Sequence, residues 1–214
     1  MTSPQQSSIY VLAGVNGAGK SSIAGAMFEE AGAAYYNPDE AARKLITENR
    51  RLTQAEANSL AWREGVRLLN RAIEERLDFA FETTLGGNTI PRLLSHAASE
   101  GIEVLVWYVG LANPELHISR VEQRVRRGGH HIGEEDIRRR YEHSRLNLIE
   151  LLPLIGSLRV FDNSFDADPN QGKTPKPKLL LHIERQRILG PSDFTGTPNW
   201  AKPIIAAAIR LDRR

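Results

Sequence analysis

The sequence predicts an α/β domain built on a mainly parallel central sheet. Short apolar segments alternate with segments of helical period, which is the pattern of strands joined by helical crossovers. Residues 103–109 are almost continuously apolar, as expected for a strand covered on both faces. The chain has 214 residues, of which 41% are hydrophobic, enough for a core without disulfides. We therefore expect three layers, with helices on both faces of the sheet.

The first half of the chain contains three strand candidates. Residues 8–15 form an apolar run, and residues 20–30 after it favour a helix. Residues 33–36 are a second strand candidate, closed by Asn37-Pro38-Asp39, and residues 78–83 are a third. Between the last two, apolar residues at helical spacing predict a long amphipathic helix, with one stripe formed by Trp62, Val66, Leu69, Ile73 and Leu77.

The second half continues the alternation. Residues 90–99 favour a helix that leads into the apolar strand 103–109, and Asn113-Pro114-Glu115 opens another helix with a cap, a first-turn proline and an acid at the positive end of the dipole. Glu134 begins a further helix with a predicted buried stripe of Ile137, Tyr141, Ser144 and Leu148 and an edge of Arg140, Ser144 and Asn147. Residues 163–178 resemble a loop, and residues 179–183 are one more strand candidate. We expect a domain over residues 1–164 and a C-terminal extension, 165–214, packed on it.

Composition excludes several classes of protein. The absence of cysteine rules out a disulfide scaffold, a thiolate zinc site and a cysteine nucleophile. The first residues lack a basic start and an apolar core, and the apolar runs are too short to span a bilayer. Because 28 basic residues are nearly balanced by 26 acidic ones, the net charge of +2 does not indicate a polyanionic partner. We expect a cytoplasmic protein that binds neither membrane nor nucleic acid.

One motif carries phosphate chemistry. Residues 14–21, GVNGAGKS, match the pattern G-x-x-x-x-G-K-[ST] between a predicted strand and a predicted helix. Glycines let the loop point its N–H groups at phosphate oxygens, Lys20 reaches the β- and γ-phosphates, and the Ser21 hydroxyl can bind Mg²⁺. The expected nucleotide-binding residues are Gly14, Asn16, Gly17, Ala18, Gly19, Lys20, Ser21 and Ser22.

The class of P-loop protein follows from what surrounds the motif. The Asn-Lys-x-Asp motif of GTPases and the Leu-Ser-Gly-Gly-Gln signature of ABC ATPases are both absent, whereas small-molecule kinases need neither. Kinases need a carboxylate near the acceptor hydroxyl, and Asp39 follows the second strand at the edge where ligands bind. The alternative for Asp39 is a helix cap or first-turn acid. Glu82, Thr83 and Thr84 end the third strand at the same edge, where they suit either a substrate hydroxyl or a simple turn.

Eight arginines lie between Arg120 and Arg145. Arg120, Arg124 and Arg127 share a helix face that ends at Gly128-Gly129, a pattern that suggests a hinged lid carrying positive charge to a transferring phosphoryl group. For any single arginine the alternative is an ordinary solvated face. His130 by itself is compatible with a turn residue, and we do not expect it to be catalytic.

Four segments in register resemble the zeta-toxin-like P-loop kinases, in particular a short bacterial branch often labelled predicted ABC-type ATPase. They are AGVNGAGKSS, NPDE, FETTLGG and RVEQRVRRGGHHIGEEDIRRRYEHS, and the resemblance runs from about residue 8 to about residue 164. It implies a P-loop kinase fold with an arginine-rich helical lid and phosphorylation, dependent on ATP and Mg²⁺, of a sugar hydroxyl on a UDP-N-acetylhexosamine, chiefly UDP-N-acetylglucosamine. It also implies a toxin with an antitoxin protein as partner.

The resemblance assigns roles by motif. Lys20 and Ser21 hold phosphate and Mg²⁺, Asp39 is the acceptor base, and the lid arginines that face phosphate are Arg124, Arg127 and Arg140. The expected substrate contacts are Asp39, Glu82, Thr83, Thr84 and His130. Gly133 departs from the branch, which usually has proline there. Two other functions remain open: a nucleoside, nucleotide or polynucleotide kinase, and a non-catalytic ATP-binding homologue that acts by binding a partner.

Overall fold

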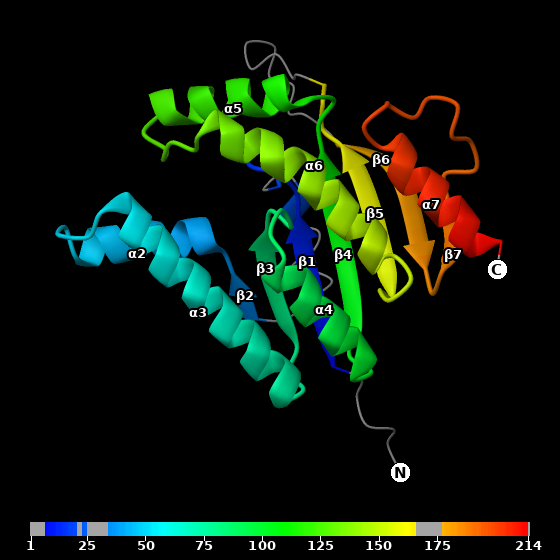
Figure 1. Ribbon diagram of the computed structural model, residues 1–214, viewed down its shortest axis with the longest axis horizontal. Coiled ribbons are helices and arrows are strands. Elements are labelled where there is room, and N and C mark those ends of the chain that lie inside the picture. Colours follow the sequence, from blue (N-terminus) through cyan, green and yellow to red (C-terminus); the bar gives the residue numbers. More distant parts are fainter. Residues whose placement is uncertain (1–6, 21–22, 25–33, 166–176, 214) are drawn as a thin grey trace.

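A central sheet organises the computed structural model, which describes residues 7–20, 23–24, 34–165 and 177–213. In the described residues the sheet has seven strands in the order β2-β3-β1-β4-β5-β6-β7. The strands are β1 (Ser8–Ala13), β2 (Ala34–Tyr36), β3 (Phe79–Thr83), β4 (Glu103–Gly110), β5 (Ser157–Asp162), β6 (Lys178–Glu184) and β7 (Arg187–Gly190). Strands β1 to β5 are parallel, β6 is antiparallel to β5 and β7 is antiparallel to β6, so the carboxyl ends of β1 to β5 meet at one edge (Figure 1).

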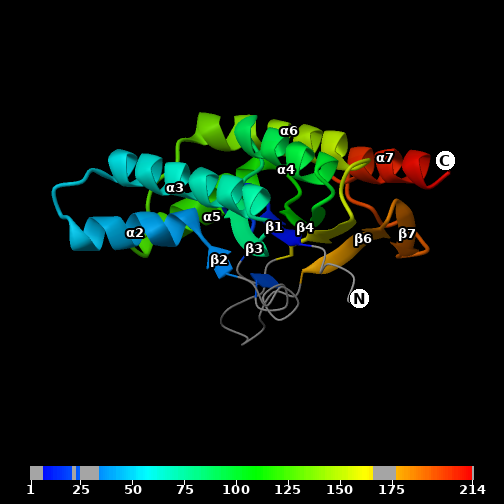
Figure 2. The same cartoon turned by 90° about the horizontal axis from the view of Figure 1, so that it is seen from below.

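Helices cover one face of this sheet (Figure 2). The helices are α2 (Pro38–Glu48), α3 (Gln54–Glu74), α4 (Thr89–Ser99), α5 (Pro114–Arg126), α6 (Glu134–Leu151) and α7 (Lys202–Asp212), and α3, α4, α6 and α7 form the covering layer. On the opposite face Leu12, Trp107 and Val109 pack with Ala18 and Ala24. The predicted α/β class with a mainly parallel sheet is confirmed, although most of the predicted helix 20–30 lies outside the described residues.

The segment after residue 37 forms two helices. Thr53 starts the second, α3, with a capping box in which its side chain and that of Glu56 bond each other's backbone N–H groups. Along the predicted α3 stripe, Leu69 and Ile73 are buried, but Trp62 is 49% exposed. The stripe therefore predicts the core contact correctly only in the C-terminal half of the helix, where Leu69 and Ile73 lie.

The C-terminal residues complete the sheet beside β5. β6 pairs with β5, while β7 and α7 have no counterpart in the sequence prediction. Trp200, just before α7, packs so closely on Gly110 that a Cβ there would lie 2.3 Å from the indole. Its Nε1 donates to Oδ1 of buried Asp162 at 3.3 Å. No helix in the described ranges is both long and apolar enough to cross a membrane.

Candidate active site

The loop after β1 lies at the carboxyl edge of the parallel strands. Gly14, Gly17 and Gly19 have φ angles of +146°, +83° and +80°, which side chains rarely adopt. A Cβ on Gly17 would lie 2.7 Å from the carbonyl oxygen of His117, and one on Gly14 would lie 2.4 Å from that of Val109. These glycines let the loop curl tightly against α5 and β4, the geometry that cradling phosphates requires.

Three side chains from distant elements hold this loop in place. His117 Nδ1 bonds the Asn16 carbonyl oxygen at 2.9 Å, Arg140 Nη1 donates to Asn16 Oδ1 at 2.7 Å, and Asn163 Nδ2 donates to the Ala18 carbonyl oxygen at 2.8 Å. Burial lowers the pKa of His117 to about 4, so its ring is neutral at pH 7 and its Nδ1 is the donor. The loop is therefore fixed without any ligand.

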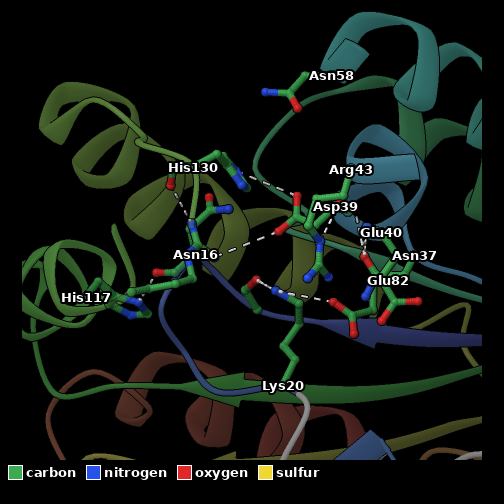
Figure 3. Close-up of polar contacts among 12 residues, drawn as sticks. Asn16, Lys20, Asn37, Asp39, Glu40, Arg43, Asn58, Glu82, His117 and His130 are labelled. Carbon is green, nitrogen blue, oxygen red and sulfur yellow. Dashed lines mark hydrogen bonds and ion pairs between the residues drawn. The ribbon is translucent and has the colours of Figure 1, made fainter. Parts of the chain in front are cut away.

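Lys20 and Glu82 point toward each other at the floor of the site (Figure 3). Lys20 Nζ donates to the Gly14 carbonyl oxygen at 3.0 Å and lies 3.9 Å from Glu82 Oε2. Tyr35 donates its hydroxyl to Glu82 Oε1 at 2.5 Å, and burial together with this carboxylate raises the pKa of Tyr35. Ser21 and Ser22 lie outside the described residues. The described residues contain no cluster of three or more His, Asp or Glu that could hold a metal ion.

The turn after β3 brings the predicted threonines to the site. Thr83 Oγ1 accepts from the Leu85 N–H at 3.0 Å, and Thr84 Oγ1 accepts from the Gly86 N–H at 3.4 Å. Asn147 of α6 donates to the Leu85 carbonyl oxygen at 2.7 Å. The turn role is thus observed, and each hydroxyl still has a proton to donate to a ligand.

Asp39 stands in the first turn of α2, and Asn37 is the N-cap. Asn37 Oδ1 accepts from the N–H groups of Asp39 at 2.9 Å and Glu40 at 3.2 Å. The Asp39 side chain is 45% exposed and lies 3.8 Å from Arg124 Nη1 and 3.9 Å from His130 Nε2. Burial lowers the pKa of His130 despite this carboxylate, so at pH 7 the cation next to Asp39 is Arg124. The cap does not use the Asp39 carboxylate, which leaves it available to a ligand.

The structure separates the three predicted lid arginines. Arg140 contacts the P-loop, and Arg124 contacts Asp39 and donates from Nη2 to the His130 carbonyl oxygen at 3.3 Å. Arg127 is the exposed C-cap residue of α5 and does not line the site cavity. Gly133, the N-cap residue of α6, has φ −61°, an angle that proline also adopts.

A cavity of about 590 Å³ lies between the P-loop, the start of α2 and the end of β3. Its walls come from α2, α3, the turn after β3 and the α5–α6 connection, residues 127–133. Of the residues predicted from the sequence it includes Asn16, Lys20, Asp39, Glu82, Thr83, Thr84, His130 and Arg140.

Several residues of the site carried no recognisable sequence signal. His117 lies in α5, Tyr35 in β2 and Asn163 directly after β5, and only their spatial neighbours give them a role. Trp62 and Asn58 of α3 also line the cavity. The helical stripe does include Trp62, but the sequence could not show that its indole faces a cavity.

Comparisons with known proteins agree with this geometry. The zeta toxin family model matches residues 1–163. An uncharacterized protein of Haemophilus influenzae (strain ATCC 51907 / DSM 11121 / KW20 / Rd) is 31% identical over 128 residues, which cover 60% of this chain and 88% of that protein.

Solved structures share the fold at low sequence identity. The AvrRxo1-ORF1:AvrRxo1-ORF2 complex with sulphate ions matches with a TM-score of 0.63 and 15% identity over 95% of this chain, and the same pair has been solved with ATP. This chain spans 64% of that matched chain. The PezAT chromosomal toxin-antitoxin system of Streptococcus pneumoniae matches with a TM-score of 0.54 and 18% identity, covering 81% of this chain and 76% of that one. The family model matches most of this chain, and the P-loop, Asp39 and Glu82 lie around one cavity. The chain therefore belongs to the zeta toxin family.

Proposed function

We propose that this protein transfers the γ-phosphoryl group of ATP to a sugar hydroxyl of a UDP-N-acetylhexosamine, chiefly UDP-N-acetylglucosamine. One observation carries the proposal: the P-loop lysine, Lys20, and the half-exposed carboxylate of Asp39, which does not cap α2, line the same cavity. Membership of the zeta toxin family supports a phosphotransferase, and the ATP complex of AvrRxo1-ORF1:-ORF2 supports ATP as the donor. The acceptor is carried by the family resemblance.

The donor side has groups that fit a nucleotide triphosphate. The glycine loop is already curled and bonded from three sides, so phosphate binding needs little rearrangement. Lys20 supplies the cation for the β- and γ-phosphates, with its Nζ now held by the Gly14 carbonyl oxygen. Mg²⁺, when bound, would neutralise charge on the same phosphates. We assign the Ser21 hydroxyl as the group that would hold it.

The acceptor side supplies the proton acceptor. In the proposed step the acceptor O–H bond breaks and its proton passes to Asp39, a new bond forms between that oxygen and the γ-phosphorus, and ADP leaves. Arg140, beside the P-loop, and Arg124, beside Asp39, offset the negative charge. Arg127 joins them only if the α5–α6 connection closes over the cavity, a movement that would also exclude water. Glu82, Thr83, Thr84 and His130 are the proposed contacts to the acceptor.

The test is transfer of labelled phosphate. The protein is incubated with γ-labelled ATP, Mg²⁺ and a panel of nucleotide sugars, nucleosides and a 5′-hydroxyl oligonucleotide, and products are identified by mass spectrometry. We expect a phosphorylated UDP-N-acetylhexosamine with the wild-type protein and none with Lys20→Ala. Phosphorylation of the nucleoside or the oligonucleotide alone would replace the acceptor, and no transfer to any compound would leave the ATP-binding homologue as the better description.

An antitoxin protein is the proposed partner, by analogy with the PezAT system. If the kinase depletes a nucleotide sugar in the cytoplasm, expression in bacteria should arrest growth, and Lys20→Ala should relieve that arrest. The measurement is growth after induction, with equal protein levels checked by immunoblot. Arrest by both forms would separate toxicity from phosphoryl transfer.

A further inference from the structure

Tryptophan 62 occupies an unusual position for an indole. It is 49% exposed, whereas Trp107 and Trp200 are 7% and 3% exposed. Trp62 nevertheless lines the cavity that contains Lys20 and Asp39. A large half-exposed aromatic ring inside a polar cavity indicates a ligand-binding surface, because ligand sites commonly combine an apolar surface with a few polar groups.

The backbone that carries this ring is fixed. Tyr36 of β2 donates its hydroxyl to the carbonyl oxygen of Ala61, next to Trp62, at 2.5 Å. A Cβ on Gly65 would lie 2.9 Å from the Tyr36 ring, so α3 approaches β2 as closely as it can. The indole therefore stands on a rigid support, which limits the entropy lost when a ligand packs against it.

Neighbouring groups give this wall of the cavity a distinct character. Asn58, one turn before Trp62, also lines the cavity, and its Oδ1 accepts from Gln54 Nε2 at 2.8 Å. That bond leaves the Asn58 amide N–H groups as donors for a ligand carbonyl. Val66 and Phe81 add apolar lining. In the view of Figure 3, Asp39 lies between Lys20 and Asn58.

We propose that Trp62 is the stacking surface for a nucleobase of the phosphoryl acceptor, with Asn58 donating to a carbonyl of that base. The proposal rests on the function proposed above and specifies how the acceptor is recognised: a nucleotide-linked sugar presents its hydroxyl to Asp39 while its base lies on α3. Stacking is tolerant of base identity, and the amide donor favours bases that carry carbonyl groups, such as uracil.

Intrinsic fluorescence tests binding without catalysis. With ADP and Mg²⁺ present in excess to fill the donor site, UDP is titrated and tryptophan emission is followed. We expect saturable quenching by UDP, none by N-acetylglucosamine 1-phosphate, which lacks a base, and none in Trp62→Phe. Since Trp107 and Trp200 are buried and do not line the cavity, a change in emission caused by contact with the ligand reports Trp62. Absence of quenching by UDP in the wild-type protein overturns the proposal.

Steady-state kinetics test the same surface in the reaction. Trp62→Ala should raise the KM for the UDP-linked acceptor by about 5- to 100-fold, as expected for losing one stacked base, with kcat and the KM for ATP unchanged. Trp62→Phe should recover most of the loss. Leu60→Ala removes another exposed apolar side chain of α3 that does not line the cavity and should behave as wild type. A rise in the KM for ATP instead would assign the ring to adenine and overturn the proposal.

The outcomes separate this inference from the proposed function. Phosphorylation of the UDP-linked sugar with an unchanged KM in Trp62→Ala overturns the stacking surface and leaves the kinase intact. If UDP quenches the wild-type protein but not Trp62→Phe, and no phosphoryl group is transferred to any acceptor, the base-binding surface is supported and the kinase function is rejected. Loss of both signals overturns both.

Discussion

The two sides of the cavity are built differently. On the donor side, the P-loop is bonded by His117, Arg140 and Asn163 from three separate elements. On the acceptor side, Asp39 is 45% exposed, and its neighbours Arg124 and His130 lie 3.8 and 3.9 Å away, beyond hydrogen-bond distance. The donor side is preorganised by buried hydrogen bonds, and the acceptor side has weaker contacts that a substrate can replace.

This difference has a physical reason. Phosphates present the same groups in every nucleotide, so a fixed loop on the sheet edge serves them well. An acceptor has to enter, be recognised and leave, which suits side chains on helices and on a glycine-containing connection. Substitutions on the donor side should therefore affect ATP use, and those on the acceptor side should affect transfer alone.

The largest effect is expected at Lys20. Lys20→Ala removes the cation from the β- and γ-phosphates, and we expect transfer to fall by about 10³- to 10⁵-fold, the scale of charged groups acting on a transferring phosphoryl group. ATP affinity should fall as well, measured by calorimetry, while the melting temperature stays close to wild type. Lys44→Ala, an exposed lysine of α2, is the matched control. Wild-type transfer by Lys20→Ala would remove the P-loop assignment.

Asp39 tests the acceptor side. Asp39→Asn keeps the shape of the side chain but cannot take a proton, so we expect transfer to drop by about 10² to 10⁴ with ATP affinity almost unchanged. Because the cap belongs to Asn37, stability should hold. Glu40→Gln, a neighbouring acid outside the cavity wall, is the control. Equal transfer by Asp39→Asn and wild type would refute the base assignment.

His117 makes the donor side sensitive to acid. Its pKa is about 4 when folded against an ordinary value of 6.5, so between these values the unfolded state binds the extra proton. The free energy of unfolding should be highest above pH 6.5 and fall, by at most about 3 kcal/mol from this group, as pH is lowered toward 4. His117→Gln keeps a donor for the Asn16 carbonyl oxygen and should flatten this part of the curve. Denaturant melts at a series of pH values measure it; an identical slope in both proteins would contradict the assignment.

The smallest effect is expected at Gly133. Its φ of −61° and the open space around it suit proline. Gly133→Pro should therefore stabilise the protein by about 0.4–1 kcal/mol, because proline lowers the conformational entropy of the unfolded chain. The expected rise in melting temperature is about 1–4 °C. Calorimetry measures it, with Gly133→Ala as the comparison. A fall in melting temperature would mean that the connection needs a conformation proline cannot adopt.

Local signals were sufficient for much of the site. The glycine pattern, the acid after β2 and the polar end of β3 each depend on a few adjacent residues. Because parallel strands share one carboxyl edge, the sequence could also predict that these segments meet. The edge of α6 was predictable in the same way: Arg140, Ser144 and Asn147 do contact the P-loop, Tyr108 and the turn after β3.

Other features depended on distant packing. Among the arginines of one predicted face, Arg124 reaches Asp39 while Arg127 is exposed at the C-cap, because α5 ends at Arg126 and the chain then turns. Trp62 belongs to an apolar stripe, yet its ring lines a cavity, whereas its neighbour Ala61 is buried against α2.

The sequence by itself determined the alternation of strands and helices, the phosphate-binding loop and the residue types at the sheet edge, since these follow from local periodicity and from glycine, proline and charge at fixed spacings. Only the tertiary structure decided that His117 and Asn163 hold the loop, that Asn37 rather than Asp39 caps α2, and that Trp62 lines the cavity. The reason is that burial and hydrogen-bond partners come from residues far apart in the chain, and one side chain can serve a core, a cap or a ligand depending on which neighbours the fold brings to it.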